Sequence, residues 1–569
     1  MEILIINLTR MGDLLQTTPL MAGMKTKYPD SRITLLVNSA FTEVCKGIPY
    51  IDNLIEFDMK GYLLRLIEGK HSLIDNYKIL DTLVNNINQK EYDLVVNVTH
   101  SSVSAVLVSL IRAKEVRGFT ISSEGHRVIK HPWVRYFFNV IPNRNYNPFH
   151  IVDMYLKIGD VNPVIRGLVY HVSEEDTLKA DKILAKEGVH VNDALVGFHL
   201  GASKDEKTWP VSSYAELADM INKQFGARIL LFGTSAEAPL ASEFEKYAET
   251  RPVNLVGKTG VGELASLLNK CSLFISNDTG PLHVATSAGT TAIDISIANV
   301  HFMETGPFGE GHYVIQADLP CSPCGFDVQC NDRVCNSLIT PEKVFEVVKM
   351  ALNRTGEEIE LSTEKMEKVQ VYRSHFQEDG YLDFTPLIKR SLQVTALYRL
   401  IYRQVLNMES KIDTGVAGMC ERICKDVAGL YLNGSISRFM EVINNDLAVL
   451  ANLVSLTRNA LSHLRKLEGE VSKGIRDIKV IKDIWKSIEP LEHEIDITGD
   501  THRCFKPLIL LFDYSKEAME GDDLEILVNN SIEIYEDFLV KGENMQAIMS
   551  GMISIVNAQT ENNELAMTL

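Results

Sequence analysis

Residues Ser276–Ala285 read SNDTGPLHVA and directly follow the apolar run Leu273–Ile275. Aspartate, threonine, glycine and histidine are therefore crowded where a buried strand would end. The first residues of a helix present N–H groups and a positive dipole end, which together bind anions such as phosphate. Pro281 suits the first turn of such a helix, where its missing N–H costs nothing. The pattern predicts an anion site; the alternative is a turn in which Asp278 or Thr279 only caps the helix.

A second turn of this kind follows the first apolar stretch of the chain. Gly12 and Asp13 stand between the predicted strand Ile3–Leu8 and a helical pattern. A carboxylate at the carboxyl end of a strand lies where open α/β sheets bind ligands. Asp13 could therefore take a proton from a substrate hydroxyl as a general base. It could equally cap the helix that follows it.

Two more turns carry groups suited to a nucleotide. Small residues in His199–Ser203 would let the backbone approach a phosphate, and Lys207 would add a mobile positive charge. Glu237 follows the predicted strand Ile229–Phe232 and could accept hydrogen bonds from a ribose diol. Its alternative role is that of an exposed glutamate in the first turn of a helix.

Alternating strands and helices must position these turns. Apolar runs bounded by polar or glycine residues, as in parallel strands buried on both faces, are followed by helical patterns such as Tyr214–Phe225 and Val261–Lys270. This alternation predicts an α/β architecture of two doubly wound, Rossmann-like domains that face a cleft, with a loop-rich boundary around residues 140–170. The expected strands are Ile3–Leu8, Ile33–Val37, Leu94–Val98, Leu195–His199, Ile229–Phe232, Leu273–Ser276 and Ala292–Ile297.

The last third of the chain has a different character. Glycine and proline become sparse, and Leu447–Leu464 and Leu524–Leu539 carry apolar residues at the three- and four-residue spacing of packed helices. We expect an all-α region there, whose role could be oligomerisation or docking. The expected domains are residues 1–165 and 166–352 for the two Rossmann-like domains, 353–382 as a linker and 383–569 as the helical region.

Composition narrows the class of protein. The chain has 569 residues, of which 45% are hydrophobic and 23% charged, as in ordinary globular proteins. Its net charge of −18 argues against nucleic acid as a partner, because no overall positive field would attract phosphate backbones. The N-terminus lacks the features of a signal peptide, and no run of about 18 apolar residues could span a membrane. We expect a cytoplasmic protein.

Several common nucleotide motifs are missing from the sequence. It contains neither a G-x-x-x-x-G-K-[ST] phosphate loop nor a G-x-G-x-x-G after the first strand. It also contains no D-x-D carboxylate pair to hold a metal on a diphosphate. Stabilisation of a diphosphate would then depend on Lys207 and on helix N-termini.

The four turns together resemble glycosyltransferase family 9, the ADP-heptose:lipopolysaccharide heptosyltransferases and their relatives. The resemblance covers roughly residues 1–350 and implies a GT-B fold, with the acceptor on the first domain and the nucleotide-sugar on the second. It also implies an inverting, single-displacement transfer that needs no cofactor or metal. The matching segments are RMGDLLQTTPL at 10–20, GASKDEKTWP at 201–210, FGTSAEA at 232–238 and SNDTGPLHVA at 276–285.

The resemblance assigns a role to each turn. It implies that Asp13 is the catalytic base, that Lys207 contacts the diphosphate and donor sugar, and that Glu237 holds the ribose. Pro281 and the Ala202-Ser203 pair depart from the family pattern and leave the identity of the sugar open. The donor-binding residues that the resemblance implies are Gly12, Ser203, Lys207, Glu237, Asp278, Thr279, Gly280 and His283.

The expected partners are a nucleotide-sugar donor resembling ADP-heptose and a glycan, lipid-linked or protein acceptor. The mixed basic and aromatic stretch Lys130–Phe138 could touch a membrane surface, which would make the protein peripheral at the inner membrane, or could form a buried helix with a basic rim. Two rival functions are a GT-B transferase for another nucleotide sugar and a degenerate transferase that serves as a scaffold through its helices.

A cluster of cysteines lies near the end of the second expected domain. In a reducing compartment, four thiolates at this compact spacing favour a structural zinc or iron ion over disulfides. Such a site would stabilise a loop and would not perform chemistry, because four protein ligands leave no open position. The alternative is a set of free or disulfide-bonded thiols. The cysteines are Cys321, Cys324, Cys330 and Cys335.

Overall fold

A computed structural model gives the architecture of the chain, which divides into two compact units. The first unit comprises residues 1–127 and 149–388, and the second comprises 128–148 and 389–569. No helix within the described residues is both long enough and apolar enough to cross a membrane. The structure describes residues 1–68, 73–326, 328, 330–353, 360–408, 410–412, 415–432, 435–473, 478–521 and 523–568.

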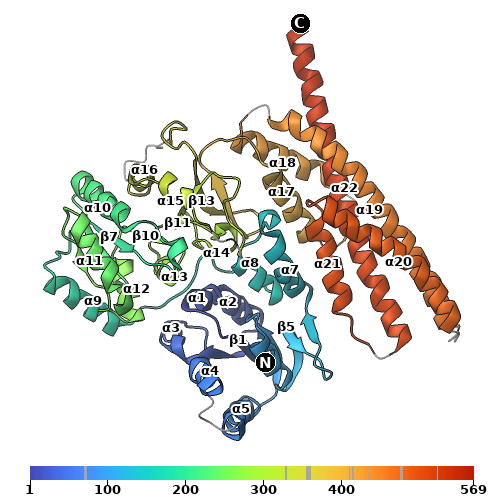
Figure 1. The fold of residues 1–569 in the computed structure, drawn as a ribbon, viewed down its shortest axis with the longest axis horizontal. Coiled ribbons are helices and arrows are strands. Elements are labelled where there is room, and N and C mark those ends of the chain that lie inside the picture. Colours follow the sequence, from blue (N-terminus) through green and yellow to red (C-terminus); the bar gives the residue numbers. More distant parts are fainter. Residues whose placement is uncertain are drawn as a thin grey trace. The chain divides into compact units, whose positions relative to one another are not determined.

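The first unit begins with a lobe built on a parallel sheet (Figure 1). Within this unit its strands follow the order β3-β2-β1-β4-β5. The central strands are buried on both faces, because β1 and its neighbours consist almost entirely of aliphatic residues. The strands are β1 (Glu2–Asn7), β2 (Arg32–Asn38), β3 (Asn53–Phe57), β4 (Tyr92–Asn97) and β5 (Ala113–Ile121).

Short helices connect and cover these strands. They begin with α1, whose first turn contains Asp13, and end with α8, which leads toward the second lobe. The helices of the first lobe are α1 (Met11–Gln16), α2 (Thr18–Lys27), η1 (Ser39–Phe41), α3 (Thr42–Cys45), α4 (Met59–Glu68), α5 (Leu73–Ile87), α6 (Ser102–Ser109) and α8 (Ile151–Ile158).

The second lobe is built on an eight-stranded sheet of order β14-β13-β12-β11-β10-β7-β8-β9. Strands β7 to β12 are parallel, whereas β13 and β14 add an antiparallel hairpin at one edge. The strands are β7 (Leu195–His199), β8 (Arg228–Phe232), β9 (Val253–Asn254), β10 (Leu273–Asn277), β11 (Ala292–Ser296), β12 (Tyr313–Ala317), β13 (Val369–Phe376) and β14 (Leu382–Pro386).

Helices lie on both faces of this sheet and complete the doubly wound pattern (Figure 1). One face packs against α10 and α16 through an aliphatic and aromatic core that includes Trp209 and Tyr214. The helices are α9 (Glu174–Lys186), η3 (Asp205–Lys207), α10 (Val211–Phe225), η4 (Ser235–Glu237), α11 (Ala238–Tyr247), α12 (Val261–Asn269), α13 (Gly280–Ser287), α14 (Phe302–Thr305), α15 (Val334–Leu338) and α16 (Pro341–Ala351).

Strand order places the predicted turns at the points where ligands bind. In each lobe, successive strands are added first on one side of the first strand and then on its other side. The strand order therefore reverses between β1 and β4 in the first lobe and between β7 and β10 in the second. Open α/β sheets bind ligands at such switch points, outside the carboxyl ends of the strands. Asp13 follows β1, His199 ends β7 and Asp278 follows β10, so all three lie at switch points.

The expected fold class is confirmed, although the structure differs from expectation in the segment after residue 352. The interpretation of the sequence divided residues 369–386 between a linker and the helical region. The structure shows that these residues form β13 and β14 and continue the sheet of the second lobe. Val369, Val371 and Phe384 are buried there, so an alternating apolar pattern was present among the polar residues.

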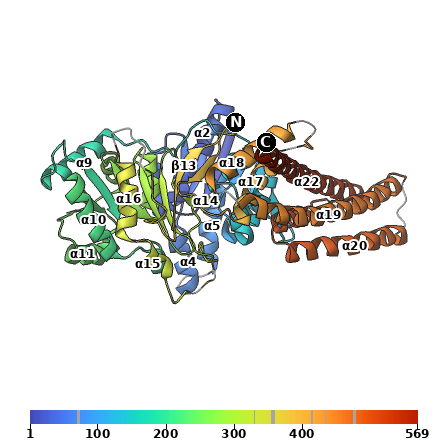
Figure 2. The same ribbon diagram turned by 90° about the horizontal axis from the view of Figure 1, so that it is seen from above.

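The second unit is helical, as expected for the C-terminal region. Its long helices α19, α20 and α22 run side by side (Figures 1 and 2). They enclose a core of buried aliphatic, aromatic and methionine side chains. The helices of residues 389–569 are α17 (Val394–Asn407), α18 (Val416–Leu430), α19 (Ser435–Ser472), α20 (Ile478–Thr501), α21 (Lys506–Glu517) and α22 (Leu524–Thr568).

Residues 128–148 belong to this helical unit although they precede it by some 240 positions. After the short strand β6 (Arg127–Lys130) they form α7 (Pro132–Val140) and η2 (Ile141–Tyr146), and α7 packs against α21. Asn139 donates a hydrogen bond to the carbonyl of Pro507, and Lys130 pairs with Glu520 at 3.0 Å. These contacts favour the buried-helix interpretation of Lys130–Phe138 over a free membrane-facing surface.

Candidate active site

Asp13 lies in the first turn of α1, where its side chain bonds back to the backbone, as the capping alternative predicted. Asp13 Oδ2 accepts a hydrogen bond from the N–H of Arg10 at 3.2 Å. The buried amide of Asn7 donates to the Asp13 carbonyl at 3.1 Å and to Thr17 Oγ1 at 2.8 Å, which fixes the start of α1. Burial raises the pKa of Asp13 and outweighs the opposing hydrogen bonds and the charge of Arg10. A carboxylate with a raised pKa is a better proton acceptor than an ordinary aspartate.

The Asp13 turn packs directly against the Asp278 turn. Helix α1 contacts α13, and Gly12 lies under the ring of His283. A Cβ added at Gly12 would come within 2.6 Å of His283 Cδ2, and one added at Gly280 would come within 2.7 Å of Met11 Cε. Gly12 is therefore needed for the close approach, whereas at Gly280 the obstacle is only the flexible end of the Met11 side chain. The structure thus brings together two predicted turns that lie about 265 residues apart in the sequence.

The Asp278 turn is fixed by a buried asparagine that the sequence interpretation did not single out. Asn277 ends β10, and its Oδ1 accepts from the N–H of Trp209 at 2.9 Å. Its Nδ2 donates to the carbonyls of Leu200 and Gly201, at 3.2 and 3.0 Å. One side chain therefore joins the end of β10 to the loop after β7. The only sequence signal was a polar residue that follows an apolar strand.

The histidine of the motif is neutral at physiological pH. His283 is buried, and burial lowers the pKa of its imidazole to about 4. Its Nε2 lies 4.0 Å from Asp278 Oδ1, which is too far for a hydrogen bond. The ring therefore contributes shape and packing against Gly12, and not a permanent positive charge.

Glu237 takes the helix-terminal position that the sequence offered as the alternative to ribose binding. Its Oε2 accepts hydrogen bonds from the N–H and hydroxyl of Thr234, at 2.7 and 2.9 Å, as a helix-capping residue does. Its Oε1 lies 3.1 Å from His199 Nε2. Burial alone would raise the pKa of Glu237, but His199 and Thr234 outweigh it and lower the pKa to about 2. Glu237 is therefore a fixed carboxylate beside the end of β7.

Lys207 and Ser203 lie on the loop between β7 and α10. Lys207 ends the single turn η3 and is half-buried, whereas Ser203 is exposed. Near this loop the structure reveals a carboxyl group that the sequence interpretation missed. Asp294 lies in the middle of β11 and is wholly buried. Burial raises the pKa of its carboxyl well above the ordinary value, and the negative charge of Asp278 raises it further. The positive charge of Lys207 acts in the opposite direction but does not outweigh them. An acid inside the apolar strand AIDIS was the signal available.

The metal expected at the four cysteines finds no support. Among the described residues, no group of three or more histidine, cysteine, aspartate or glutamate side chains is arranged to hold a metal ion. None of the four thiols forms a disulfide. Burial raises the pKa of Cys324, and the other three thiols lie near enough to raise it further.

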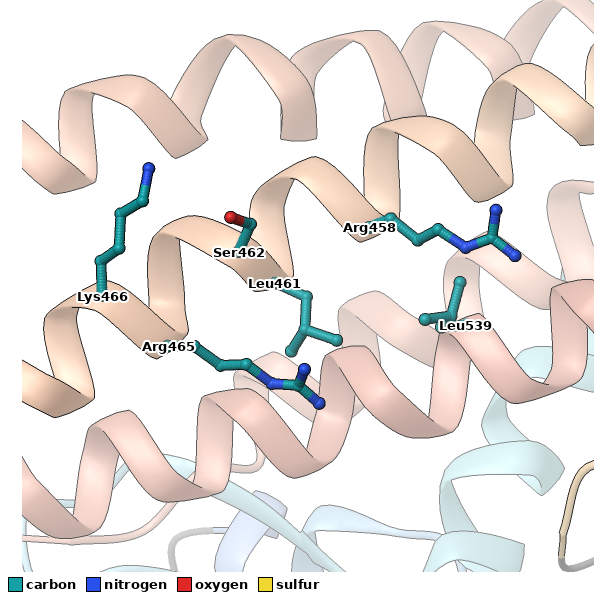
Figure 3. A pocket seen from close by; sticks show the side chains of 6 residues that line it. All are labelled: Arg458, Leu461, Ser462, Arg465, Lys466 and Leu539. Atoms are coloured by element: carbon teal, nitrogen blue, oxygen red, sulfur yellow. The ribbon is translucent and has the colours of Figure 1, made fainter.

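A pocket of about 460 Å³ lies in the helical unit between α19 and α22 (Figure 3). Two of its basic side chains already face acids, because Arg458 pairs with Glu543 and Arg465 pairs with Glu536. None of the residues that line it belongs to the predicted site. The lining residues are Arg458, Leu461, Ser462, Arg465, Lys466 and Leu539.

Comparison with known proteins agrees with this geometry. Residues 81–333 match glycosyltransferase family 9 (heptosyltransferase). The chain is 25% identical over 295 residues to lipopolysaccharide heptosyltransferase 3 of Escherichia coli K12, across 51% of this chain and 80% of that protein. It is 24% identical over 302 residues to the lipopolysaccharide core heptosyltransferase OpsX of Haemophilus influenzae, across 51% of this chain and 77% of that protein.

A solved structure shares the fold of the first unit. The glycosyl transferase family 9 protein from Veillonella parvula superposes with a TM-score of 0.51 and 24% sequence identity, covering 62% of this chain and 97% of that one. Two Rossmann-like lobes in succession constitute the GT-B fold. The chain therefore contains a family 9 glycosyltransferase domain of GT-B fold, followed by an additional helical region, and it is a glycosyltransferase.

Proposed function

We propose that this enzyme transfers a heptose from a nucleotide-diphosphate donor, ADP-heptose or a close analogue, to a hydroxyl of a lipopolysaccharide core. The packing of the Asp13 turn against the Asp278 turn carries this proposal, because it sets a proton acceptor beside a helix N-terminus suited to a diphosphate. The names of the relatives support heptose and lipopolysaccharide as donor sugar and acceptor.

The proposed reaction is a single displacement with inversion. The acceptor hydroxyl loses its proton to Asp13 while its oxygen forms a bond to the anomeric carbon of the donor. The bond from that carbon to the diphosphate breaks on the opposite face, and the nucleoside diphosphate leaves with the electron pair. The raised pKa of Asp13 suits it to receive the proton.

Charge on the departing diphosphate needs stabilisation within the donor site. We assign this to Lys207 and to the N-terminus of α13, with Gly280 close to the phosphates and Asp278 close to the sugar. The sequence carries no D-x-D pair, so we propose that the transfer proceeds without a metal. A cytoplasmic enzyme working at the inner membrane would meet both the nucleotide-sugar and a lipid-linked acceptor.

A donor screen tests this proposal. The full chain is titrated calorimetrically with ADP-, UDP-, GDP- and CDP-linked sugars, and transfer to purified heptose-deficient lipopolysaccharide is followed with whichever sugars bind. We expect binding and transfer with the ADP-linked heptose alone. Binding of a UDP- or GDP-sugar in its place would identify a different transferase, and failure of all four nucleotides to bind would favour a scaffold.

A further inference from the structure

The helices α4 and α5 of the first lobe turn large apolar side chains toward solvent. The two helices contact each other, and residues 69–72 join them in the sequence (Figure 1). Ile67, near the end of α4, is 79% exposed, and Ile74, in the first turn of α5, is 65% exposed. Groups of large exposed apolar residues are uncommon on globular proteins and mark interaction sites. The residues concerned are Leu63, Leu64, Ile67, Ile74 and Tyr77.

The exposed side chains of α4 do not belong to the core of the lobe. The inward face of this helix carries Met59 and Tyr62, which pack against the core, and the Tyr62 ring lies 5.8 Å from the ring of Phe57. A different face carries the exposed residues, because positions three and four apart lie together on a helix. The members of this outward face are Lys60, Leu63, Leu64 and Ile67.

Helix α5 repeats the arrangement in its first two turns. Its inward face carries Leu83 and Ile87, which are buried in the same core. Ile74 and Lys78 stand one turn apart on the outward face, with Tyr77 beside them. Aliphatic residues next to a tyrosine and lysines suit the interface of a bilayer. There the apolar part of a lysine stays with the lipid while its ammonium reaches the headgroups.

The charges of this segment favour a bilayer over a second copy of the chain. From Asp58 to Asp81 the sequence holds four acidic and four basic residues, whereas the whole chain carries a net charge of −18. An anionic bilayer that repels most of the protein is therefore not repelled here. A two-fold contact between copies would instead place Lys60 and Lys78 on both sides of one interface.

We propose that the outward faces of α4 and α5 form a docking face that binds a lipid bilayer containing anionic phospholipids. The aliphatic and tyrosine side chains enter the interface, and the two lysines meet the headgroups. The inference goes beyond the proposed function, because it concerns a surface and not the donor site. It gives the first lobe a means of meeting a lipid-linked acceptor, and it assigns membrane contact to a segment other than Lys130–Phe138.

Vesicle sedimentation with the full chain tests the docking face. The probes are vesicles of phosphatidylethanolamine with phosphatidylglycerol, and vesicles of phosphatidylcholine alone. We expect the wild type to bind the anionic vesicles more tightly. Ile67→Ser with Ile74→Ser should weaken that binding about 10²-fold, since an isoleucine that enters lipid contributes on the order of tenfold. Lys60→Glu with Lys78→Glu should weaken it by at least about tenfold and change binding to phosphatidylcholine little.

Matched controls come from α9 in the second lobe. Leu178 is 60% exposed there, and Lys182 stands one turn further along the helix. Leu178→Ser with Lys182→Glu changes the same two kinds of side chain outside the docking face, so vesicle binding should stay at the wild-type level. Every substituted residue is exposed, and thermal melting and ADP titration should therefore match the wild type for all variants.

The docking face is overturned if the wild type binds neither kind of vesicle, or if serine at both isoleucines leaves binding intact. Sedimentation velocity without lipid tests the other occupant, because a dimer that the serine variant dissociates would identify a contact between copies. The proposed function fails separately. A chain that binds ADP but no vesicle loses only the docking face, and a chain that binds vesicles but no ADP loses only the proposed donor.

Discussion

Buried polar side chains meet different surroundings in the two units. In the helical unit the hydroxyls of Tyr398 and Tyr402 donate to Asp446 and to the carbonyl of Cys504, both at 2.6 Å. In the first unit the buried carboxyl oxygens of Asp294 have no hydrogen-bond partner, and neither do the amide atoms of Gln16. An unsatisfied buried polar group costs free energy, so a fold retains it only where something else is gained.

The contrast indicates what each unit is built for. The Tyr398 and Tyr402 hydroxyls tie parts of the helical unit together, as stability alone requires. In the first unit Asp13, His199 and Asp278 lie at the carboxyl ends of β1, β7 and β10. Strained or incompletely satisfied polar groups are typical of ligand sites. We therefore expect variants in the two units to affect different measurements.

Asp13→Asn should give the largest effect. The amide keeps the shape of the side chain but cannot accept the acceptor's proton, so kcat should fall about 10²–10⁴-fold. ADP affinity and unfolding free energy should change little, because the side chain has no assigned contact with the nucleotide. Steady-state kinetics and calorimetry measure both, with the exposed Asp30→Asn of the same lobe as the control. Near-native turnover of Asp13→Asn would remove Asp13 from the role of base.

Leu450→Ala should show the converse behaviour in the helical unit. Leu450 lies on α19 and is fully buried in the helical core, so its truncation should cost about 2–5 kcal/mol. Urea unfolding should show the loss, whereas ADP affinity should match the wild type. Asn445→Ala, an exposed position on the same helix, provides the control. A parallel loss of ADP binding would show that the donor site depends on the helical unit.

The comparison also shows how much a sequence can predict. All the strands expected from apolar runs were found, because a parallel strand buried on both faces leaves a continuous signal. Strands β3, β5, β6, β9 and β12 were not predicted; β3, for example, is mostly exposed and carries polar residues. The hairpin of β13 and β14 was not predicted, because its strands are antiparallel and their alternating apolar residues are interspersed with polar ones.

The candidate site was predictable to a similar extent. Motif turns gave Asp13, Lys207, Glu237 and Asp278, because small, acidic and basic residues after apolar runs stand out. Asn277, which fixes the Asp278 turn, and the buried Asp294 were not predictable, since both lie within strands, where a polar residue has no periodic signature. The grouping of 128–148 with the helical unit depends on contacts with residues more than 350 positions away, which local patterns do not record.

Asp294→Asn should stabilise the first unit in a pH-dependent way. The raised pKa means that the unfolded chain ionises this group above about pH 3.8 while the folded chain keeps it protonated, so stability falls as the pH rises from there. Asparagine cannot ionise, and the variant should gain roughly 1–3 kcal/mol at pH 7 and almost nothing at pH 4. Urea unfolding at the two pH values measures the difference. An equal gain at both would point to packing and not to ionisation.

Tyr402→Phe should have a smaller effect, and of opposite sign. Tyr402 is 1% exposed and its hydroxyl donates to the Cys504 carbonyl, so removal of the oxygen leaves that carbonyl without this donor and should cost about 1 kcal/mol. Tyr247→Phe, at an exposed position of the first unit, should be neutral. Urea unfolding at pH 7 compares both with Asp294→Asn. If loss of the paired hydroxyl proved harmless, hydrogen bonding could not explain the difference between the units, and the partnered tyrosines would be held by packing alone.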